Sequence, residues 1–245
     1  SNLKFFAETL PLIKIMSNEI LFVVRALVDL LLVLIAFRLF GRQGLFVAIV
    51  ANLILVTIFG GKLVEYFGFV TNAGNIFYAT TFFATHILME HYDLEEGLKT
   101  VGIGILGLVF LMIMGFISIY QASIPETSAV SDALGTIFAI APRIAFGSLF
   151  AYMISQFVNI RLYDYMHQKS GQSGLWRRSL GSATVAQLLD SIIFFSIAFA
   201  GTMSIQILAQ TILIGFLAKV LVAILGLPFL YASNRFKPTA AISDE

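Results

Sequence analysis

Two of the chain's three histidines and one glutamate lie close together in the stretch THILMEHY, residues 85–92. His86 and Glu90 are four positions apart, so a helix would place both side chains on one face. Such a cluster could hold a metal, relay a proton, contact a ligand or mark a helix end that reaches water. The spacing differs from both histidine–glutamate zinc signatures, and the chain has no cysteine, so the sequence does not favour a metal site or a zinc enzyme.

Other polar side chains fall near the middle of apolar segments, where ionisable groups are costly and usually line an internal cavity or pathway. Asp190 and Lys219 lie at similar depth in consecutive segments, which predicts an internal ion pair. That pair could be a structural clasp between two helices or part of a polar ligand cavity. Arg25 and Asp29, four positions apart, are interpreted as a self-neutralising packing pair. The remaining candidates are Asn52, Arg143, Gln156 and Gln187.

The composition indicates which solvent these segments face. Hydrophobic residues make up 59% of the 245 positions and charged residues only 12%, whereas soluble domains average about 45–50% apolar and about 25% charged. So few charges cannot coat a water-facing surface, and the chain is predicted to be an all-α integral membrane protein in contact with the lipid bilayer. The net charge of +1 gives no indication of nucleic-acid binding, and no cofactor is expected.

About seven segments are long and apolar enough to cross a bilayer, which takes about 20 residues of helix. We expect two long extramembrane loops between them, at 123–132 and 163–178, and no strands. Residues 1–19 are interpreted as an amphipathic lead-in at the membrane surface. The predicted spans are 20–37, 44–60, 73–90, 98–121, 136–160, 183–201 and 204–231.

The distribution of Lys and Arg near the span ends predicts the orientation. Nine basic residues fall on one side and three on the other, which places the N-terminus outside and the C-terminus inside. Residues 91–97 would then lie in the cytoplasmic headgroup region, and the histidine–glutamate pair could simply be a helix end that meets water. The inner set is Arg38, Arg42, Lys99, Arg161, Lys169, Arg177, Arg178, Arg235 and Lys237, and the outer set is Lys4, Lys14 and Lys62.

Five stretches, in order and with similar spacing, resemble the vitamin uptake transporter family, now regarded as queuosine precursor transporters. The resemblance covers roughly residues 30–231. The stretches are FGRQGLFVAIVANLILVTIFGG (40–61), TNAGNIFYATTFFATHILMEHY (71–92), APRIAFGSLFAYMISQFVNIRLYDYM (141–166), LWRRSLGSATVAQLLDSIIFFSIAFAG (175–201) and AKVLVAILGLPFLYA (218–232).

The resemblance implies a six-helix core similar to the substrate-binding components of energy-coupling-factor vitamin importers. The chain then divides into a lead-in at 1–19, an additional transmembrane helix at 20–40, the transporter core at 41–232 and a cytoplasmic tail at 233–245. The resemblance also implies a multi-pass protein of the inner (plasma) membrane that imports a 7-deazaguanine compound for tRNA modification. That compound would be 7-cyano-7-deazaguanine, 7-aminomethyl-7-deazaguanine or queuine. An ATPase partner and a homo-oligomer remain open.

This chain departs from the family pattern where His86 and Asn159 each replace an Asp and Asp93 replaces a Gly. Amides and carboxylates would match the donors and acceptors of a planar, purine-like substrate. Phe82, Phe83, Tyr152 or Phe194 would stack on its ring. The residues predicted to bind or gate the substrate are Asn52, His86, Glu90, Arg143, Gln156, Gln187, Asp190 and Lys219.

Two other functions remain open from the sequence. The chain could transport another vitamin or nucleobase-like solute, or it could be a non-transporting membrane subunit that docks to partners through its cytoplasmic loops. An enzyme is the least favoured class, and no catalytic residue is expected.

Overall fold

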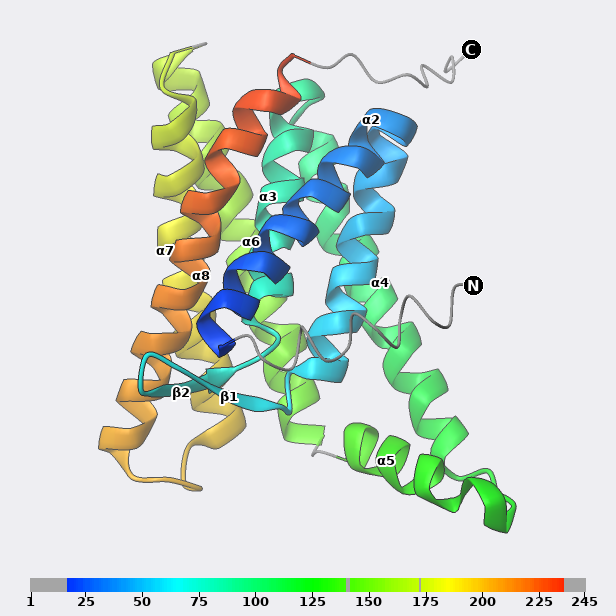
Figure 1. Ribbon diagram of the computed structural model, residues 1–245. Coiled ribbons are helices and arrows are strands. Elements are labelled where there is room, and N and C mark those ends of the chain that lie inside the picture. The colour runs from blue at the N-terminus through cyan, green and yellow to red at the C-terminus, as the bar shows by residue number, and fades with distance from the viewer. Residues whose placement is uncertain (1–16, 140–141, 172, 236–245) are drawn as a thin grey trace.

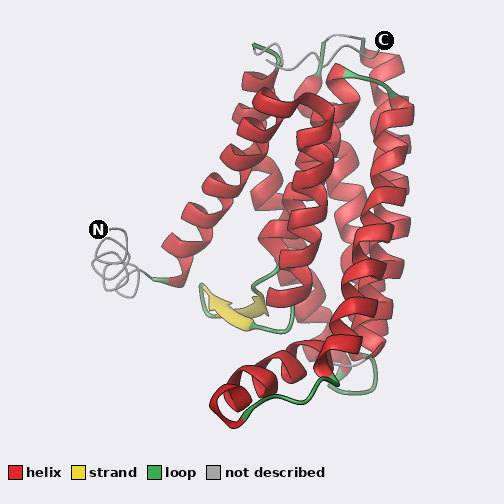
Figure 2. Cartoon of the chain, turned by 90° about the vertical axis from the view of Figure 1, so that its right-hand side faces the viewer, coloured by secondary structure: helices red, strands yellow, loops and turns green. Residues whose placement is uncertain are grey.

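In the computed structural model, residues 17–139, 142–171 and 173–235 are described, without the side chains of 139 and 142–145. Long helices form a bundle, with a short β-hairpin and one shorter helix at the same end (Figures 1 and 2). The helices are α2 (Asn18–Phe59), α3 (Asn75–His91), α4 (Leu94–Ile119), η1 (Pro125–Thr127, a 3-10 turn), α5 (Ser128–Ala139), α6 (Pro142–Ser170), α7 (Leu175–Phe199) and α8 (Ile205–Ser233).

The described helices confirm an α-helical membrane protein. By length and composition, α2, α4, α7 and α8 are each able to cross a membrane. α3 is shorter and richer in polar residues, but all of it except Phe77, Glu90 and His91 is buried. Protein rather than lipid therefore surrounds its polar side chains. The predicted lead-in lies outside the described residues except for its last three positions, as do Lys4, Lys14 and Lys237.

α2 consists of two helical arms joined by a sharp bend at Gly41, where φ is 57° and ψ is −136°. The arms run in opposite directions (Figure 1), so they correspond to the first two predicted spans. A side chain is also excluded near the bend at Gly44, where a Cβ would lie 2.1 Å from the carbonyl oxygen of Ala36. The close return of the second arm therefore depends on glycine at both positions.

Both predicted extramembrane loops are wrong. Most of 123–132 is helical, because η1 and the start of α5 occupy it. The helix that corresponds to the predicted span at 136–160, α6, begins at Pro142. Proline is well suited to the first turn of a helix. The second loop shrinks to 171–174, because α6 continues to Ser170 and α7 begins at Leu175. Hydropathy shows where a helix leaves the apolar part of the bilayer, not where the helix ends. Here α6 and α7 continue beyond their predicted spans with polar residues.

The expectation of no strands is also wrong. β1 (Leu63–Tyr66) and β2 (Phe69–Asn72) pair antiparallel, with Leu63 opposite Asn72. The two residues between them, Phe67 and Gly68, both have positive φ, as expected for a tight two-residue hairpin turn. Four-residue strands are too short to give a recognisable alternation in the sequence.

The connections alternate between the two ends of the bundle, as the predicted spans require. One end, here called the Gly41 end, carries the α2 bend, the α3–α4 turn, the α6–α7 turn and the end of α8 (Figure 1). The other, here called the hairpin end, carries β1 and β2, α5 and the α7–α8 connection (Figure 1). The basic residues predicted to lie inside therefore gather toward the Gly41 end.

Replacing Gly41 with alanine should destabilise the protein, because a Cβ is strained at this combination of φ and ψ. Residues held in such backbone regions cost about 1–3 kcal/mol each. Thermal unfolding in detergent should therefore show a lower midpoint for Gly41→Ala. The matched control is Gly102→Ala in α4, where a Cβ meets nothing within 4 Å and alanine is the better helix former. Equal midpoints for the two variants would contradict the strained bend.

Candidate functional site

A cavity of about 390 Å³ lies toward the hairpin end, walled by the second arm of α2, the end of β2, and α3, α4, α5, α6, α7 and α8. Its wall is largely apolar and includes the rings of Phe116, Phe138 and Phe194. A mostly apolar cavity of this size with a few polar groups is typical of small-molecule sites. The polar residues in its wall are Thr57, Asn72, Asn75, Tyr78, Ser148, Asp190 and Lys219.

The predicted ion pair between Asp190 and Lys219 is present in the wall of this cavity. Lys219 Nζ lies 2.5 Å from Asp190 Oδ2 and donates to Ser191 Oγ at 3.1 Å. The ammonium also lies 4.9 Å from the centre of the Tyr78 ring. Asp190 and Lys219 are each only 2% exposed. The pair therefore ties α7 to α8 and also presents charge to the cavity.

The predicted pairing of Arg25 with Asp29 is wrong. Arg25 instead donates to the backbone carbonyl of Ala73 at 3.2 Å and lies 4.9 Å from the centre of the Phe77 ring. Among the described residues no ion pair joins it to Asp29, whose Oδ2 is buried without a hydrogen bond. The spacing i, i+4 permits contact, but the longer arginine side chain reaches the start of α3.

Two predicted amides are buried with unsatisfied polar atoms. Gln187 lies one turn from Asp190 on α7, and within the described part of the chain neither its Nε2 nor its Oε1 has a hydrogen bond. Asn52, in the second arm of α2, has an unpaired Oδ1 and neighbours Asp29. Neither residue lines the cavity. Buried groups of this kind normally bond to water or ligand.

Hydrogen bonds across the bundle centre connect Gln156 to His86. Gln156 Nε2 donates to Thr81 Oγ1 and Thr85 Oγ1 at 3.4 and 3.3 Å, and its Oε1 accepts from Asn159 Nδ2 at 3.2 Å. Asn159 Oδ1 in turn lies 3.0 Å from Nε2 of His86. Two of the predicted site residues are therefore linked through Asn159.

His86 lies inside the bundle rather than at a water-exposed helix end. The ring is 2% exposed and stacks on Tyr163 with the ring centres 4.6 Å apart. Its Nδ1 lies 2.9 Å from Ser179 Oγ, while Nε2 also lies 3.2 Å from Ser182 Oγ. An Asn oxygen can only accept, so Nε2 carries the proton and Nδ1 accepts from the Ser179 hydroxyl.

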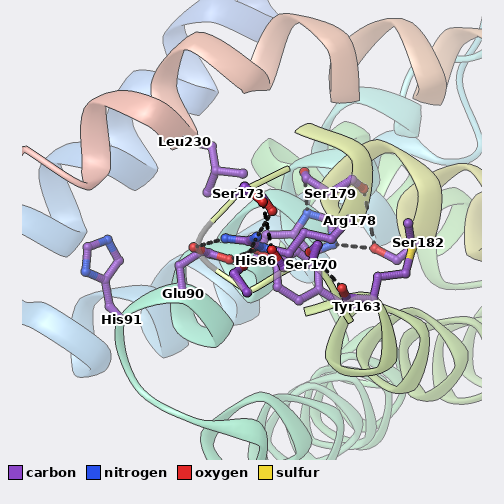
Figure 3. Close-up of polar contacts among 12 residues, drawn as sticks. His86, Glu90, His91, Tyr163, Ser170, Ser173, Arg178, Ser179, Ser182 and Leu230 are labelled. Atoms are coloured by element: carbon purple, nitrogen blue, oxygen red, sulfur yellow. Dashed lines mark hydrogen bonds and ion pairs between the residues drawn. The ribbon is translucent and has the colours of Figure 1, made fainter. Parts of the chain in front are cut away.

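Glu90 is held by Arg178 in a buried, two-point ion pair (Figure 3). Arg178 Nε lies 2.5 Å from Oε1 of Glu90, and Nη2 lies 2.6 Å from Oε2. The hydroxyl of Tyr163 donates to the same carboxylate. His91 is separate from this group and bonds to Ser233 Oγ at 3.1 Å. The name Glu90 cluster is used below for His86, Glu90, Tyr163 and Arg178.

These contacts form one polar seam between α3, α6 and α7, with the cavity at one end and the Glu90 cluster at the other. Tyr78, in the cavity wall, bonds through its hydroxyl to Ser155 Oγ at 2.8 Å. Among the described residues no three His, Asp or Glu side chains are grouped so that they could hold a metal ion. The groups in the seam are mainly hydroxyls and amides, which can both donate and accept hydrogen bonds. The members of the seam are Tyr78, Thr81, Thr85, His86, Glu90, Ser155, Gln156, Asn159, Tyr163, Arg178, Ser179 and Ser182.

The other residues predicted from the sequence, Arg143 and the four aromatic rings, are not part of the seam as the structure describes it. The side chain of Arg143 lies outside the described residues. Of the four rings expected to stack on a substrate, only Phe194 lines the cavity. Phe82, Phe83 and Tyr152 belong to the hydrophobic core.

Sequence reasoning missed Arg178, which was counted only as one of the basic residues that set the orientation. The signal that could have identified it is the spacing along α7. Arg178, Ser182, Ala186 and Asp190 follow one another at intervals of four, and all are buried. This row becomes visible only when the helix is extended back to Leu175.

Comparison with known proteins gives two matches. Residues 72–233 match a family model described as "Putative vitamin uptake transporter". The chain is also 34% identical over 231 residues to a protein of Bacillus subtilis (strain 168) named "Probable queuosine precursor transporter", covering 91% of this chain and 97% of that protein. No solved structure matches the chain. The stretch that matches the family model contains the whole polar seam and the Asp190–Lys219 pair.

The Asp190–Lys219 pair should behave as a single unit when it is mutated. Removing one partner of a buried pair typically costs about 3–5 kcal/mol, because the other charge remains buried alone. Asp190→Asn and Lys219→Met should each lower the free energy of unfolding in detergent, and the double variant should lose less than their sum. The control Lys62→Met removes an exposed lysine beside β1 and should change little. Strictly additive losses would show that the two residues do not interact.

Proposed function

This chain belongs to the vitamin uptake transporter family, and from that premise we propose that it imports a queuosine precursor of the 7-deazaguanine type for tRNA modification. Membership of the family makes it a multi-pass membrane transporter rather than an enzyme. The cavity is the observation that supports the finer assignment. It combines a carboxylate, an ammonium group, two amides and aromatic rings around one apolar space.

The chemistry of the cavity complements a guanine-like edge. A 7-deazaguanine keeps the carbonyl acceptor and the amino donor of guanine, beside a ring N–H that also donates. In this proposal the Asp190 carboxylate accepts from the two adjacent donors, while Lys219 and Asn75 donate to the carbonyl. The ring of Phe194 covers one face of the heterocycle. A ligand bound in this way competes with Lys219 for Asp190.

The remaining predicted residues are proposed to contact the solute as it moves through the protein, after it has left its first binding position in the cavity. Gln187 has both polar atoms unpaired one turn beyond Asp190, so it supplies the next donor and acceptor. Gln156 and His86 follow along the seam toward the Gly41 end. Asn52 and Arg143 remain candidates for substrate contact or gating.

We place the transport unit in residues 41–232, as a six-helix core like that of energy-coupling-factor substrate-binding components, preceded by the first arm of α2. The core lies in the plasma membrane with the Gly41 end inside. Among the described residues, Arg38 lies near the bend at Gly41 and Lys169 and Arg177 flank the α6–α7 turn, whereas Lys62 lies directly before β1. An excess of basic residues marks the cytoplasmic side.

The transport assignment is tested by uptake in cells that can neither make the 7-deazaguanine precursor nor take it up themselves, but that keep the later steps to queuosine. Supplying 7-cyano-7-deazaguanine to cells that produce this protein should restore queuosine in tRNA. Asp190→Asn should reduce uptake at least tenfold, because an amide cannot accept two adjacent donors. Asp132→Asn changes an exposed carboxylate on α5 and should leave uptake unchanged.

Purified protein in liposomes decides between the rival functions. Uptake of labelled 7-cyano-7-deazaguanine, with competition by unlabelled 7-deazaguanines, supports the proposal. Competition by an unrelated vitamin or nucleobase alone would shift the substrate assignment. No uptake of any tested solute, at normal protein levels, would favour a non-transporting subunit.

The orientation is tested by a reporter fused after Glu245. A fluorescent protein fused there should fold and fluoresce, and a phosphatase that is active only outside the cytoplasm should remain inactive. Fusion of the same reporters within the α7–α8 connection provides the opposite control. Phosphatase activity at the C-terminus would overturn both the orientation and the alignment with the six-helix core.

A further inference from the structure

The Glu90 cluster joins three helices at the end of the seam that lies away from the cavity (Figure 3). Glu90 comes from the last turn of α3, Tyr163 from α6 and Arg178 from the first turn of α7. Nη1 of Arg178 also donates to the backbone carbonyl of Gly171 at 3.0 Å, which ties the α6–α7 turn to the same guanidinium. One side chain therefore holds α3, α6 and α7 together where the seam would reach water.

The degree of burial is unusual for charged residues at the end of a helical bundle. Arg178 and Tyr163 are 1% and 0% exposed, and the side chain of Glu90 is 6% exposed. The neighbouring Arg177 is exposed and lies over the Trp176 ring. Two adjacent arginines thus have opposite environments, and only Arg178 closes the seam.

An ion pair at the end of a bundle has a closed arrangement and a separated one. While it is closed, each charge is stabilised by its partner in place of water. Once separated at the end of the bundle, both charges can be hydrated, so neither is left buried and alone. An element with two discrete arrangements of this kind can act as a gate.

α7 connects this pair to the cavity. Asp190 lies twelve positions after Arg178 on the same helix, roughly 18 Å along its axis. At its cavity end α7 is tied to Lys219 of α8, and at its Gly41 end it is tied to Glu90 of α3. A solute that competes for Asp190 weakens the first tie, and a rigid helix carries that change to the second.

We propose that the Glu90 cluster is the gate at the Gly41 end of the transport path, closed while Arg178 bonds to Glu90 and opened when α7 moves away from α3. The identity of the solute in this proposal rests on the proposed transport function, whereas the position of the gate rests on the contacts of the Glu90 cluster. With the gate closed, the seam beyond Ser182 is inaccessible from the Gly41 end. With it open, His86, Asn159 and Gln156 face water and the departing solute.

The gate can be tested with single thiols, because the chain contains no cysteine. Ser182→Cys introduces a thiol one turn beyond Arg178, at a position that is 0% exposed. A membrane-impermeant maleimide is applied in vesicles that expose the Gly41 end, and the labelling rate is measured. Gln168→Cys, on the exposed end of α6, is the control and should react at one rate in every background.

Opening the gate by mutation should expose the buried thiol without any solute. The labelling rate of Ser182→Cys should rise at least tenfold when Glu90→Gln and Arg178→Gln are combined, because no buried charge then remains. Tyr163→Phe alone should give a smaller increase in the labelling rate. If the double variant does not fold, the labelling rate in Tyr163→Phe tests the gate instead. An unchanged rate in the folded variants would overturn the proposal, as would a rate for unaltered Ser182→Cys equal to that of Gln168→Cys.

Adding solute tests the gate and the transport assignment independently of each other. In the Ser182→Cys protein, 7-cyano-7-deazaguanine should raise the labelling rate severalfold, and Asp190→Asn should abolish this effect. If the mutations accelerate labelling but no 7-deazaguanine does, the gate stands and the substrate is wrong. If neither accelerates labelling, the Glu90 cluster is a static structural contact.

Discussion

The rest of the structure depends on one constraint: a charge inside a bundle that lies in lipid is costly unless a partner of opposite charge accompanies it. Asp190 and Glu90 meet this constraint through Lys219 and Arg178, with Arg178 in the first turn of α7 and Asp190 just past its middle. Each pair joins α7 to a different helix, so α7 is fixed to α8 near the cavity and to α3 at the other end. Between the pairs, neutral amides, hydroxyls and one imidazole complete the seam without adding charge. The polar centre of the bundle is therefore compatible with a lipid surround.

The sequence was sufficient to predict the first of these pairs but not the second. Asp190 and Lys219 stand out because apolar residues surround them, so their depth could be read from the spans. Arg178 lies in the hydrophilic stretch LWRRS, before the predicted span at 183–201, so its place in one row with Ser182 and Asp190 was not recognised and it was treated like Arg177. Glu90 was recognised, but its partner comes from a helix that begins 85 residues later. Contacts over such separations depend on packing angles that a local pattern does not contain.

The helices were predicted better than the features between them for a related reason. Hydrophobic composition identifies a helix that meets lipid, so the seven predicted spans correspond in position to the two arms of α2 and to α3, α4, α6, α7 and α8. The cavity could not be predicted, because its wall combines Phe116 of α4, Phe138 of α5 and Phe194 of α7. Asp29 and Gln187 were recognisable as buried polar residues. That Oδ2 of Asp29 and the amide of Gln187 have no hydrogen bond within the described residues depends on neighbours from several helices.

The burial of α3 has a consequence for how the protein is made. Its threonines, histidine and glutamate are tolerated because other helices enclose them, and a helix carrying such groups inserts poorly when lipid alone surrounds it. Partners of α3 on α6, α7 and α8 emerge from the ribosome only after it. We therefore expect the nascent helix to reach its final environment only after those helices have emerged. Biogenesis of this bundle is then cooperative and late, because this polar helix is enclosed only when the chain is almost complete.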